Sequence, residues 1–345
     1  MKKSLLALAV LTAISGAASA QSSVTLYGKV DVGLVYDAGS SAGKSLRIDS
    51  GITGGSRIGF KGVEDLGGGM KASFQLETGF CADGANGTDT RPNFCTGSNQ
   101  FMGRQAYGAL SGGFGSISGG RQYSLGFIAL TTIDPFGTGL AGQINNIFDP
   151  SNVRLNNSVQ YNTPVFGGFN LSGEVALGER QGDWKAGRET GGALTYASGP
   201  IYGAVTIYDV NTTLSPADPT ARKTWQAGGT YDFGVVKLAG LVQGTKSDQN
   251  LAAKFDRLNL MAGVTVPLAG GSVMASYIHS NDKEIANQDA SQVGIGYMYP
   301  LSKRTSLYGA FAKINNQHGG LFTVGNATDS GIGNKAFDLG VVHNF

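Results

Sequence analysis

Alternation of apolar and polar residues between positions 46 and 80 constrains the fold of this chain more than any other feature. At every second position the apolar residues are Leu46, Ile48, Ile52, Ile58 and Phe60, then Met70, Ala72, Phe74, Leu76 and Phe80. The opposite set includes Arg47, Asp49, Arg57 and Lys61, then Lys71, Ser73, Gln75 and Glu77. Because a β-strand points successive side chains to opposite faces, this pattern predicts a hairpin with one apolar and one charged face.

Both arms of this hairpin, 46–63 and 70–80, are long. Strands of soluble proteins typically have about five or six residues, whereas a tilted strand needs about ten to cross a bilayer. Long strands with one apolar face are typical of a transmembrane β-barrel.

The first twenty residues predict a secretory signal peptide. Lys2-Lys3 precedes an apolar run from Leu5 to Ile14, and Ala18-Ser19-Ala20 provides the small residues of a cleavage site. We therefore expect residues 1–20 to be removed and residues 21–345 to form a single domain. The alternative, a helical membrane anchor, needs about 20 apolar residues, which is more than this run offers.

Composition narrows the class of the exported chain. Beyond residue 20, no stretch approaches the roughly 18 consecutive apolar residues of a membrane-spanning helix. Without Lys2 and Lys3, the basic residues equal the 24 acidic ones in number, so no nucleic-acid partner is expected. A soluble secreted β protein, such as a lectin, or an outer-membrane barrel remains. A barrel distributes its apolar residues in alternation, which fits a hydrophobic content of only 41%.

Turn signals divide the chain into sixteen predicted strands between Ser23 and Phe345. The short connections are 64–69, 112–115, 165–168, 198–200, 232–235, 268–271 and 301–304. The long connections are 38–45, 81–100, 125–153, 179–189, 211–223, 245–256, 280–290 and 315–335. Short turns on one rim and long loops on the other are typical of bacterial outer-membrane barrels. The predicted fold is all-β, a sixteen-stranded antiparallel transmembrane β-barrel wide enough for an aqueous channel.

The third long connection, 125–153, is unusual because it is rich in apolar residues. They are Phe127, Ile128, Leu130, Phe136, Leu140, Ile144, Ile147 and Phe148. Long loops without structure of their own tend to be functional, and an apolar loop can fold into a wide barrel and pack against its wall. The alternative is that this loop covers the barrel mouth or contacts a neighbouring subunit.

Cys81 and Cys95 are the only cysteines, and both lie in the second long connection. In an exported chain, two cysteines this close favour a structural disulfide. The alternatives are two free thiols or half of a metal site, but His279, His318 and His343 lie far away in sequence. We expect no metal and no cofactor.

Several short motifs in this order resemble the general trimeric porins of Gram-negative bacteria, especially the β-proteobacterial branch. They are Ser23-Val-Thr-Leu-Tyr-Gly-Lys29, the segment 57–67, Lys71-Ala-Ser-Phe-Gln-Leu-Glu77, Gly119-Gly-Arg-Gln-Tyr123, the segment 154–161 and the terminal His343-Asn344-Phe345. The resemblance implies a homotrimer in the outer membrane, in contact with lipid and lipopolysaccharide. It also implies that Phe345 is the C-terminal signal recognised by the barrel-assembly machinery.

In that family the third long loop folds inward and narrows the pore, with basic residues facing acidic ones. By matched position, the resemblance assigns the basic side to Arg57, Arg104 and Arg154, with Lys29 and Lys61 nearby, and the acidic side to Glu77 and Asp134. Alternation independently supports Lys29, Arg57, Lys61, Glu77 and Arg154, because their apolar neighbours fall on the opposite face. Alternation around Arg104 is not clear.

One departure from the family pattern affects selectivity. Related enterobacterial porins carry Pro-Glu-Phe-Gly-Gly in the inserted loop, whereas this chain reads Asp134-Pro-Phe-Gly-Thr-Gly139 and lacks that glutamate. The basic residues of the expected constriction then outnumber the carboxylates, which favours anions in a narrow neck.

The expected function is passive diffusion of ions and small hydrophilic solutes, with a modest anion preference. A substrate-specific channel is the nearest alternative, but Arg47, Lys71, Lys237 and Arg257 are scattered and form no continuous basic ladder along the pore. A barrel enzyme would need a nucleophile, a base and an orienting carboxylate, and no convincing catalytic set is found around His279 or His343. The glycines at 67–69 fit a tight turn, since no phosphate-loop Gly-Lys-Ser/Thr follows.

Overall fold

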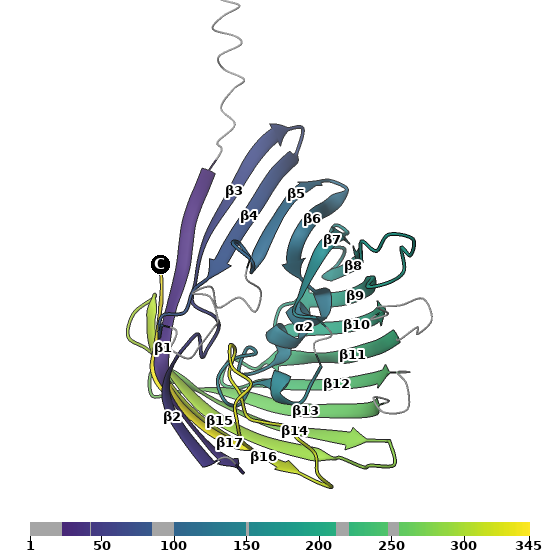
Figure 1. The fold of residues 1–345 in the computed structure, drawn as a ribbon. Helices are drawn as coiled ribbons and strands as arrows, with labels where there is room; N and C mark the ends of the chain where they lie inside the picture. The colour runs from purple at the N-terminus through teal and green to yellow at the C-terminus, as the bar shows by residue number, and fades with distance from the viewer. Residues whose placement is uncertain (1–22, 42, 85–99, 150–151, 212–220, 248–254) are drawn as a thin grey trace, which may run out of the picture.

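One antiparallel sheet of seventeen strands closes on itself in the computed structural model (Figure 1). The structure describes residues 23–41, 43–84, 100–149, 152–211, 221–247 and 255–345. The strands are β1 (Ser23–Ser40), β2 (Gly43–Ser50), β3 (Arg57–Gly67), β4 (Met70–Gly79), β5 (Gln105–Gly112), β6 (Gly115–Tyr123), β7 (Arg154–Asn162), β8 (Phe169–Ala176), β9 (Glu189–Ser198), β10 (Ile201–Asn211), β11 (Ala221–Asp232), β12 (Lys237–Ser247), β13 (Phe255–Leu268), β14 (Gly271–Asp282), β15 (Ala290–Pro300), β16 (Thr305–Asn316) and β17 (Lys335–Asn344). Among the described residues, no helix is both long enough and apolar enough to span a membrane.

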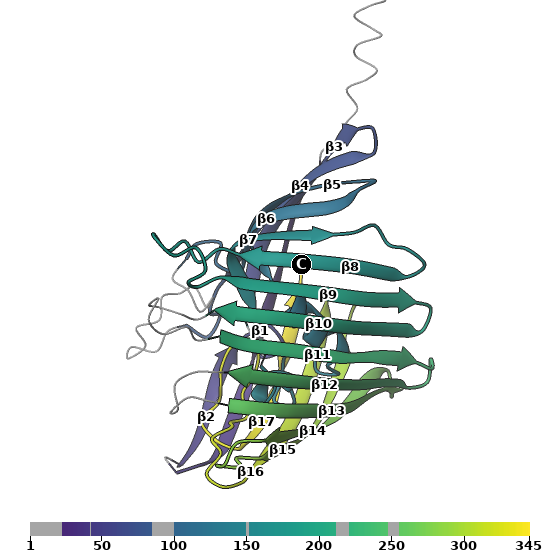
Figure 2. The ribbon, with the colours of Figure 1, turned by 90° about the vertical axis from the view of Figure 1, so that its right-hand side faces the viewer.

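The ring closes where the first and last strands meet. β1 pairs with β17 from Lys29 to Ala38. Both β2 and β3 pair with the other edge of β1, at successive parts of its length, so they share one position in the ring. The seventeen strands therefore fill sixteen positions, which confirms the predicted sixteen-stranded antiparallel barrel. Figure 2 shows β7 to β13 side by side, with the short turns along one edge of the sheet.

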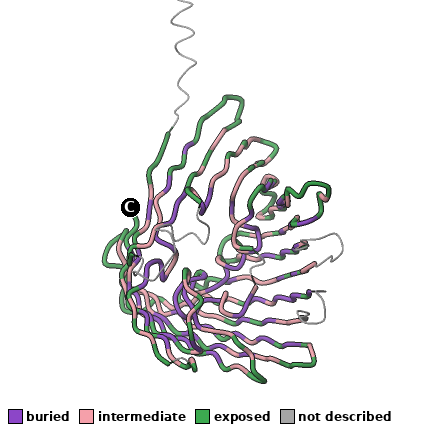
Figure 3. The backbone as a smooth tube through the Cα atoms, in the orientation of Figure 1, coloured by how far each residue is buried: buried purple, intermediate pink, exposed green. Residues whose placement is uncertain are grey.

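Exposure alternates along the strands as the sequence pattern predicts. Leu46 and Ile48 are 69% and 58% exposed on the outer face, while Glu77 is only 2% exposed. Buried and exposed positions follow one another along most strands in Figure 3. The outer apolar side chains form the surface that lipid covers in a transmembrane barrel.

The predicted first arm, 46–63, is not one continuous strand. It is interrupted between β2 and β3, where Gly51 and Gly54 adopt φ angles of +81° and +155° that glycine reaches without steric cost. We call the interrupting residues Gly51–Ser56 the inner turn. Ile52, predicted on the outer apolar face, is instead fully buried inside the barrel. The inner turn has an even number of residues, so the strand faces on either side of it still follow the alternation.

The third long connection folds inward, as predicted, and adds local structure that the sequence pattern did not predict. It contains helix α2 (Leu125–Ile133) and a short 3-10 helix, η1 (Ile144–Asn146). Ser124 caps α2 by accepting a hydrogen bond from the Phe127 N–H at 3.2 Å. Helix α2 contacts β9, β10, β11 and β12, so it lies against the inside of the wall (Figure 1).

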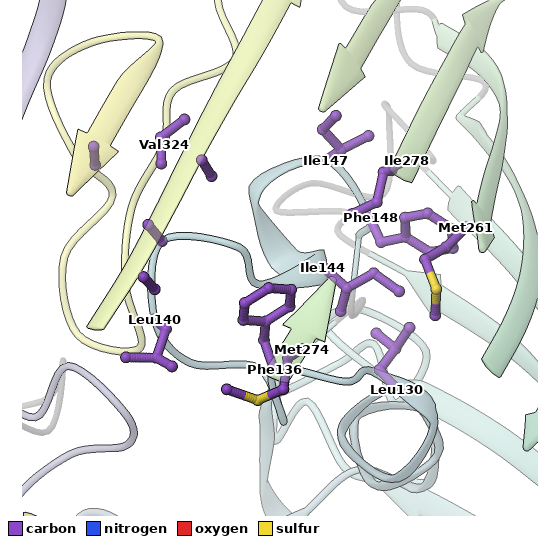
Figure 4. Close-up of a cluster of buried hydrophobic side chains, with 14 of the residues drawn as sticks. Leu130, Phe136, Leu140, Ile144, Ile147, Phe148, Met261, Met274, Ile278 and Val324 are labelled. Atoms are coloured by element: carbon purple, nitrogen blue, oxygen red, sulfur yellow. The ribbon is translucent and has the colours of Figure 1, made fainter. Parts of the chain in front are cut away.

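An apolar core joins this inserted loop to the barrel wall (Figure 4). The loop contributes Leu130, Phe136, Leu140, Ile144, Ile147 and Phe148, and the wall contributes Met261, Met274 and Ile278. Val324, from the last long loop, is also fully buried in this core. Two of the apolar loop residues behave differently, since Phe127 is half-buried and Ile128 is 45% exposed. Burial of each large apolar side chain contributes about 1.5–3 kcal/mol, so this core stabilises the loop inside the barrel.

Candidate pore constriction

Five basic side chains gather on one part of the inner wall. They are Lys29 on β1, Arg57 and Lys61 on β3, Arg104 directly before β5, and Arg154 at the start of β7. Strand register brings the first of them together, because Lys29 lies directly opposite Arg57 in the β1–β3 pair. The Arg104 backbone N–H donates to the Glu77 carbonyl at 3.1 Å, which anchors Arg104 beside β4. We call these five residues the basic wall.

Glu77 lies inside the basic wall. Its Oε1 is 2.7 Å from Arg104 Nε and 3.8 Å from Arg57 Nη1, and its Oε2 accepts a hydrogen bond from the Tyr27 hydroxyl at 2.9 Å. Glu77 and Arg104 are both almost completely buried. A carboxylate held this way offsets part of the positive charge around it and fixes the Arg104 side chain.

Tyr123 is a member of the site that the sequence did not predict. Its hydroxyl oxygen accepts hydrogen bonds from Arg104 Nη2 at 2.7 Å and from Arg154 Nη2 at 3.1 Å. The Arg154 guanidinium also lies 4.8 Å from the centre of the Tyr123 ring, and that ring stacks on Phe127 of the inserted loop. Tyr123 therefore holds two guanidinium groups together and links them to the loop.

Alternation alone could not have identified Tyr123. The register between β6 and β7 shifts between Gly120 and Gln122, where β7 contains one extra residue, so simple counting does not place Tyr123 opposite Arg154. The one sequence feature that points to Tyr123 is its position, because it ends the strand that leads into the apolar loop.

The two lysines of the basic wall have looser contacts. Lys29 Nζ donates to Thr53 Oγ1 of the inner turn at 3.5 Å. Lys61 is exposed, with its ammonium 5.4 Å from the centre of the Tyr27 ring. Both lysines add positive charge at the margin of the arginine group.

Asp134 does not belong to the acidic side of the constriction, which corrects the expectation from the resemblance. It is 5% exposed, and its carboxylate accepts the backbone N–H groups of Phe136, Thr138 and Ile144 at 3.1, 2.9 and 3.0 Å. Burial raises the pKa of Asp134 to about 6, against the opposing effect of these three hydrogen bonds. The residue closes the bend of the loop, because its short carboxylate can satisfy several backbone donors at once.

The inserted loop therefore presents little charge to the channel. Between 125 and 149 its only charged residues are Asp134 and Asp149. Asp134 is buried, and Asp149 forms an ion pair with Arg222 at 3.0 Å. The candidate constriction is therefore asymmetric, with the basic wall on one side and a largely uncharged loop on the other.

The remaining predicted residues lie outside this constriction. Phe345 pairs through its backbone with Gly28, at 3.0 and 3.1 Å, and so completes the junction of the chain ends. Cys81 is disulfide-bonded, and its predicted partner Cys95 lies outside the described residues. The predicted signal peptide, 1–20, lies outside them as well. Within the described part of the chain, no three His, Cys, Asp or Glu side chains form a group that could hold a metal ion.

Comparison with known proteins gives consistent matches along the chain. A family profile described as Gram-negative porin matches residues 7–319. Outer membrane porin protein 32 of Delftia acidovorans is 39% identical over 334 residues, covering 92% of this chain and 90% of that protein. The major outer membrane protein P.IB of Neisseria lactamica is 29% identical over 357 residues, covering 97% and 100% of the two chains.

Solved structures match the fold over nearly the whole chain. An anion-selective porin from Comamonas acidovorans superimposes with a TM-score of 0.81 at 32% sequence identity, covering 94% of this chain and 100% of that one. OmpF of Salmonella typhi gives a TM-score of 0.70 at 17% identity, covering 93% and 97%, which is a likeness of fold alone.

Proposed function

We propose that this chain, which belongs to the Gram-negative porin family, forms a water-filled channel for passive diffusion of ions and small hydrophilic solutes, with a preference for anions. It is an outer-membrane protein, as its relatives are. The observation that carries the anion preference is the asymmetry of the candidate constriction. Its wall holds five basic side chains and one carboxylate, Glu77, whereas the two carboxylates of the loop are buried or paired.

The physical basis of the preference is the electrostatic potential of the neck. A cluster of like charges in a narrow passage with low-dielectric walls concentrates counter-ions there and repels ions of the same sign. Glu77 lowers this potential but does not cancel it, because one carboxylate sits among Arg57, Arg104 and Arg154. Anions gain no single deep binding site from this arrangement, so they can enter and leave quickly. Diffusion down a gradient needs no energy source and no cofactor.

The alternative functions receive less support. A substrate-specific channel would need a selective site continuing beyond the neck, whereas the contacts of Arg47 and Arg257 are with Asp37, Asp49 and Phe322 rather than with one another. For a barrel enzyme, the described residues offer a Ser–His contact between Ser291 and His279, 3.0 Å apart. Ser291 also bonds the exposed Tyr277, on the outer side of the barrel, away from the channel.

Membership of the porin family supports a proposal for assembly. We propose a homotrimer in contact with lipid and lipopolysaccharide, formed after removal of residues 1–20. We also propose that Phe345 is recognised by the barrel-assembly machinery, and its exposed side chain at the end of the last strand supports this role.

The experiment is a reversal-potential measurement on the purified protein in a planar bilayer with a KCl gradient. The expected result is stepwise channel insertion and a reversal potential of the sign for chloride preference. A potential of the cation-selective sign would overturn the anion preference but leave the porin assignment intact. Failure of the folded protein to form any channel would overturn the porin function itself.

A further inference from the structure

The inner turn, Gly51–Ser56, lies against the middle of β1, where neither β2 nor β3 pairs with that strand. Asp31 of β1 lies opposite this gap. Its carbonyl accepts the Gly51 N–H at 2.9 Å, and its N–H donates to Ser56 Oγ at 3.1 Å. The backbone of Asp31 therefore holds both ends of the inner turn.

The Asp31 side chain holds the tip of the same turn. Its Oδ2 accepts hydrogen bonds from the Thr53 N–H and from the Thr53 hydroxyl, both at 2.6 Å. Its Oδ1 accepts the hydroxyl of Tyr308, on β16, at 2.6 Å. Asp31 is fully buried, and a buried carboxylate is costly unless hydrogen bonds of this kind satisfy it.

On one side, the inner turn contacts the inserted loop. The Ile52 carbonyl accepts the Leu140 N–H at 2.8 Å, and the fully buried Ile52 side chain joins the apolar core of the loop. The last long loop reinforces this contact, because the Ala327 N–H donates to the same carbonyl at 3.3 Å and Thr328 Oγ1 donates to the Ser50 carbonyl at 2.7 Å.

On its other side, the inner turn contacts the basic wall. Lys29 bonds Thr53, as described above. A Cβ atom added at Gly55 would lie 2.7 Å from Arg104 Nη1, and one at Gly54 would lie 3.3 Å from Lys29 Nζ. The backbone of the inner turn thus passes directly against two cations of the constriction, which glycine permits.

Resting on the proposed function, we propose that Asp31 is a positioning residue that sets the spacing between the basic wall and the inserted loop. Through the inner turn it fixes the loop at Leu140 and the wall at Lys29 and Arg104. The anion preference then depends on Asp31 even though this residue is itself negatively charged.

The test is Asp31→Asn, because two possible effects of this change have opposite signs. Loss of a negative charge near Lys29 would by itself raise the anion preference and leave the conductance nearly unchanged. Release of the inner turn would let the loop move away from the wall, so the conductance would rise and the reversal potential would shift toward zero. We expect the second result, measured in a planar bilayer with a KCl gradient against the wild-type channel.

Two further variants keep the outcome decisive. Thr53→Val removes the hydroxyl bonded to Asp31 and Lys29 without changing charge. It should shift the conductance and the reversal potential in the same direction as Asp31→Asn, but by a smaller amount. Asp37→Asn is the matched control, because it removes a buried carboxylate from the same strand, one that pairs with Arg47 and not with the inner turn. It should increase the anion preference.

Circular dichroism and heat-modifiable gel mobility establish that each variant has folded as a barrel. If Asp31→Asn does not fold, Thr53→Val alone tests whether the inner turn sets the spacing between the wall and the loop. The proposal is overturned if Asp31→Asn increases the anion preference as Asp37→Asn does, or if Thr53→Val leaves conductance and reversal potential unchanged. Either result leaves the porin function standing, because that function is judged on the wild-type channel alone.

Discussion

The two sides of the constriction are held in place by different forces. The basic wall is fixed by charged hydrogen bonds, with Arg104 bonded to Glu77 and to Tyr123. The inserted loop is fixed mainly by apolar burial, with Leu130, Leu140 and Ile144 almost completely buried. In the proposed constriction, the basic wall therefore carries the charge and the inserted loop supplies the apolar volume that narrows the passage.

Because of this difference, ion selectivity and the width of the pore depend on different residues. Charges act on ions over roughly a Debye length, about 10 Å at 0.1 M salt, so the basic wall can select ions without touching them. An apolar loop acts by excluding volume, and its effect depends on how firmly it packs. Changes to the wall should therefore alter mainly the reversal potential, and changes to the loop should alter mainly the conductance.

The largest effect is expected when the arginines of the wall are neutralised together. Replacing Arg57, Arg104 and Arg154 by Gln leaves Lys29 and Lys61 as the only cations of the wall, with Glu77 still present. The reversal potential in a KCl gradient should lose its anion-selective sign and move toward that of a cation-preferring channel.

A matched control for this triple variant removes the same charge elsewhere. Lys71, Lys237 and Arg257 are basic residues of other strands, and replacing them by Gln lowers the net charge equally. The control channel should keep its anion preference. Equal shifts in the two triple variants would mean that net charge, and not the basic wall, determines selectivity.

The membrane-facing and lumen-facing positions could be predicted because they depend on local sequence alone. In a strand, the face of a residue follows from counting along the chain, so Arg57, Lys61 and Glu77 could be assigned to the inner face from their neighbours. The strand count could be predicted for the same reason, since each short turn has its own local signal.

Contacts between distant segments could not be predicted in this way. Tyr123 meets Arg154 across a shifted register, and Asp31 meets Tyr308 from the opposite end of the chain. The inner turn was missed because its residues keep the alternating pattern while its glycines take positive φ angles. Asp134 was misassigned because the family position implies a lumen-facing carboxylate, whereas here the neighbouring backbone N–H groups bind it.

The second largest effect is expected from Glu77→Gln. This change keeps the shape of the side chain but removes the negative charge between Arg57 and Arg104. The anion preference should increase, in the direction opposite to the arginine variants. Removing one partner of a buried ion pair costs about 3–5 kcal/mol, so the melting temperature of the barrel should fall as well.

Glu77→Asp is the conservative control for the charge. Its carboxylate is one methylene shorter and should restore the wild-type reversal potential while restoring only part of the stability. If Glu77→Gln leaves the reversal potential unchanged, Glu77 does not contribute to the potential of the neck.

A smaller effect on selectivity, with a clear effect on conductance, is expected from Leu140→Ala. Truncating a buried leucine costs about 2–5 kcal/mol and leaves a cavity, here in the core that holds the tip of the inserted loop. Single-channel recordings should show a higher or noisier conductance, and the reversal potential should move toward zero by much less than in the arginine variants. Leu171→Ala, on the exposed outer face of β8, removes the same atoms without affecting the loop. A change in reversal potential as large as that of the arginine variants would contradict the separation of the two sides.

The smallest effect on selectivity is expected from Asp134→Asn. If Asp134 faced the channel, removing its charge would increase the anion preference much as Glu77→Gln does. Because it is buried and bonded to three backbone N–H groups, the reversal potential at pH 7 should stay close to that of the wild type and should not become more anion-selective. The asparagine amide cannot accept all three hydrogen bonds, and a buried unsatisfied donor costs about 1–3 kcal/mol, so the loop should be looser and the current noisier. An unchanged current noise together with a shifted reversal potential would mean that Asp134 faces the lumen. The loop would then contribute directly to selectivity.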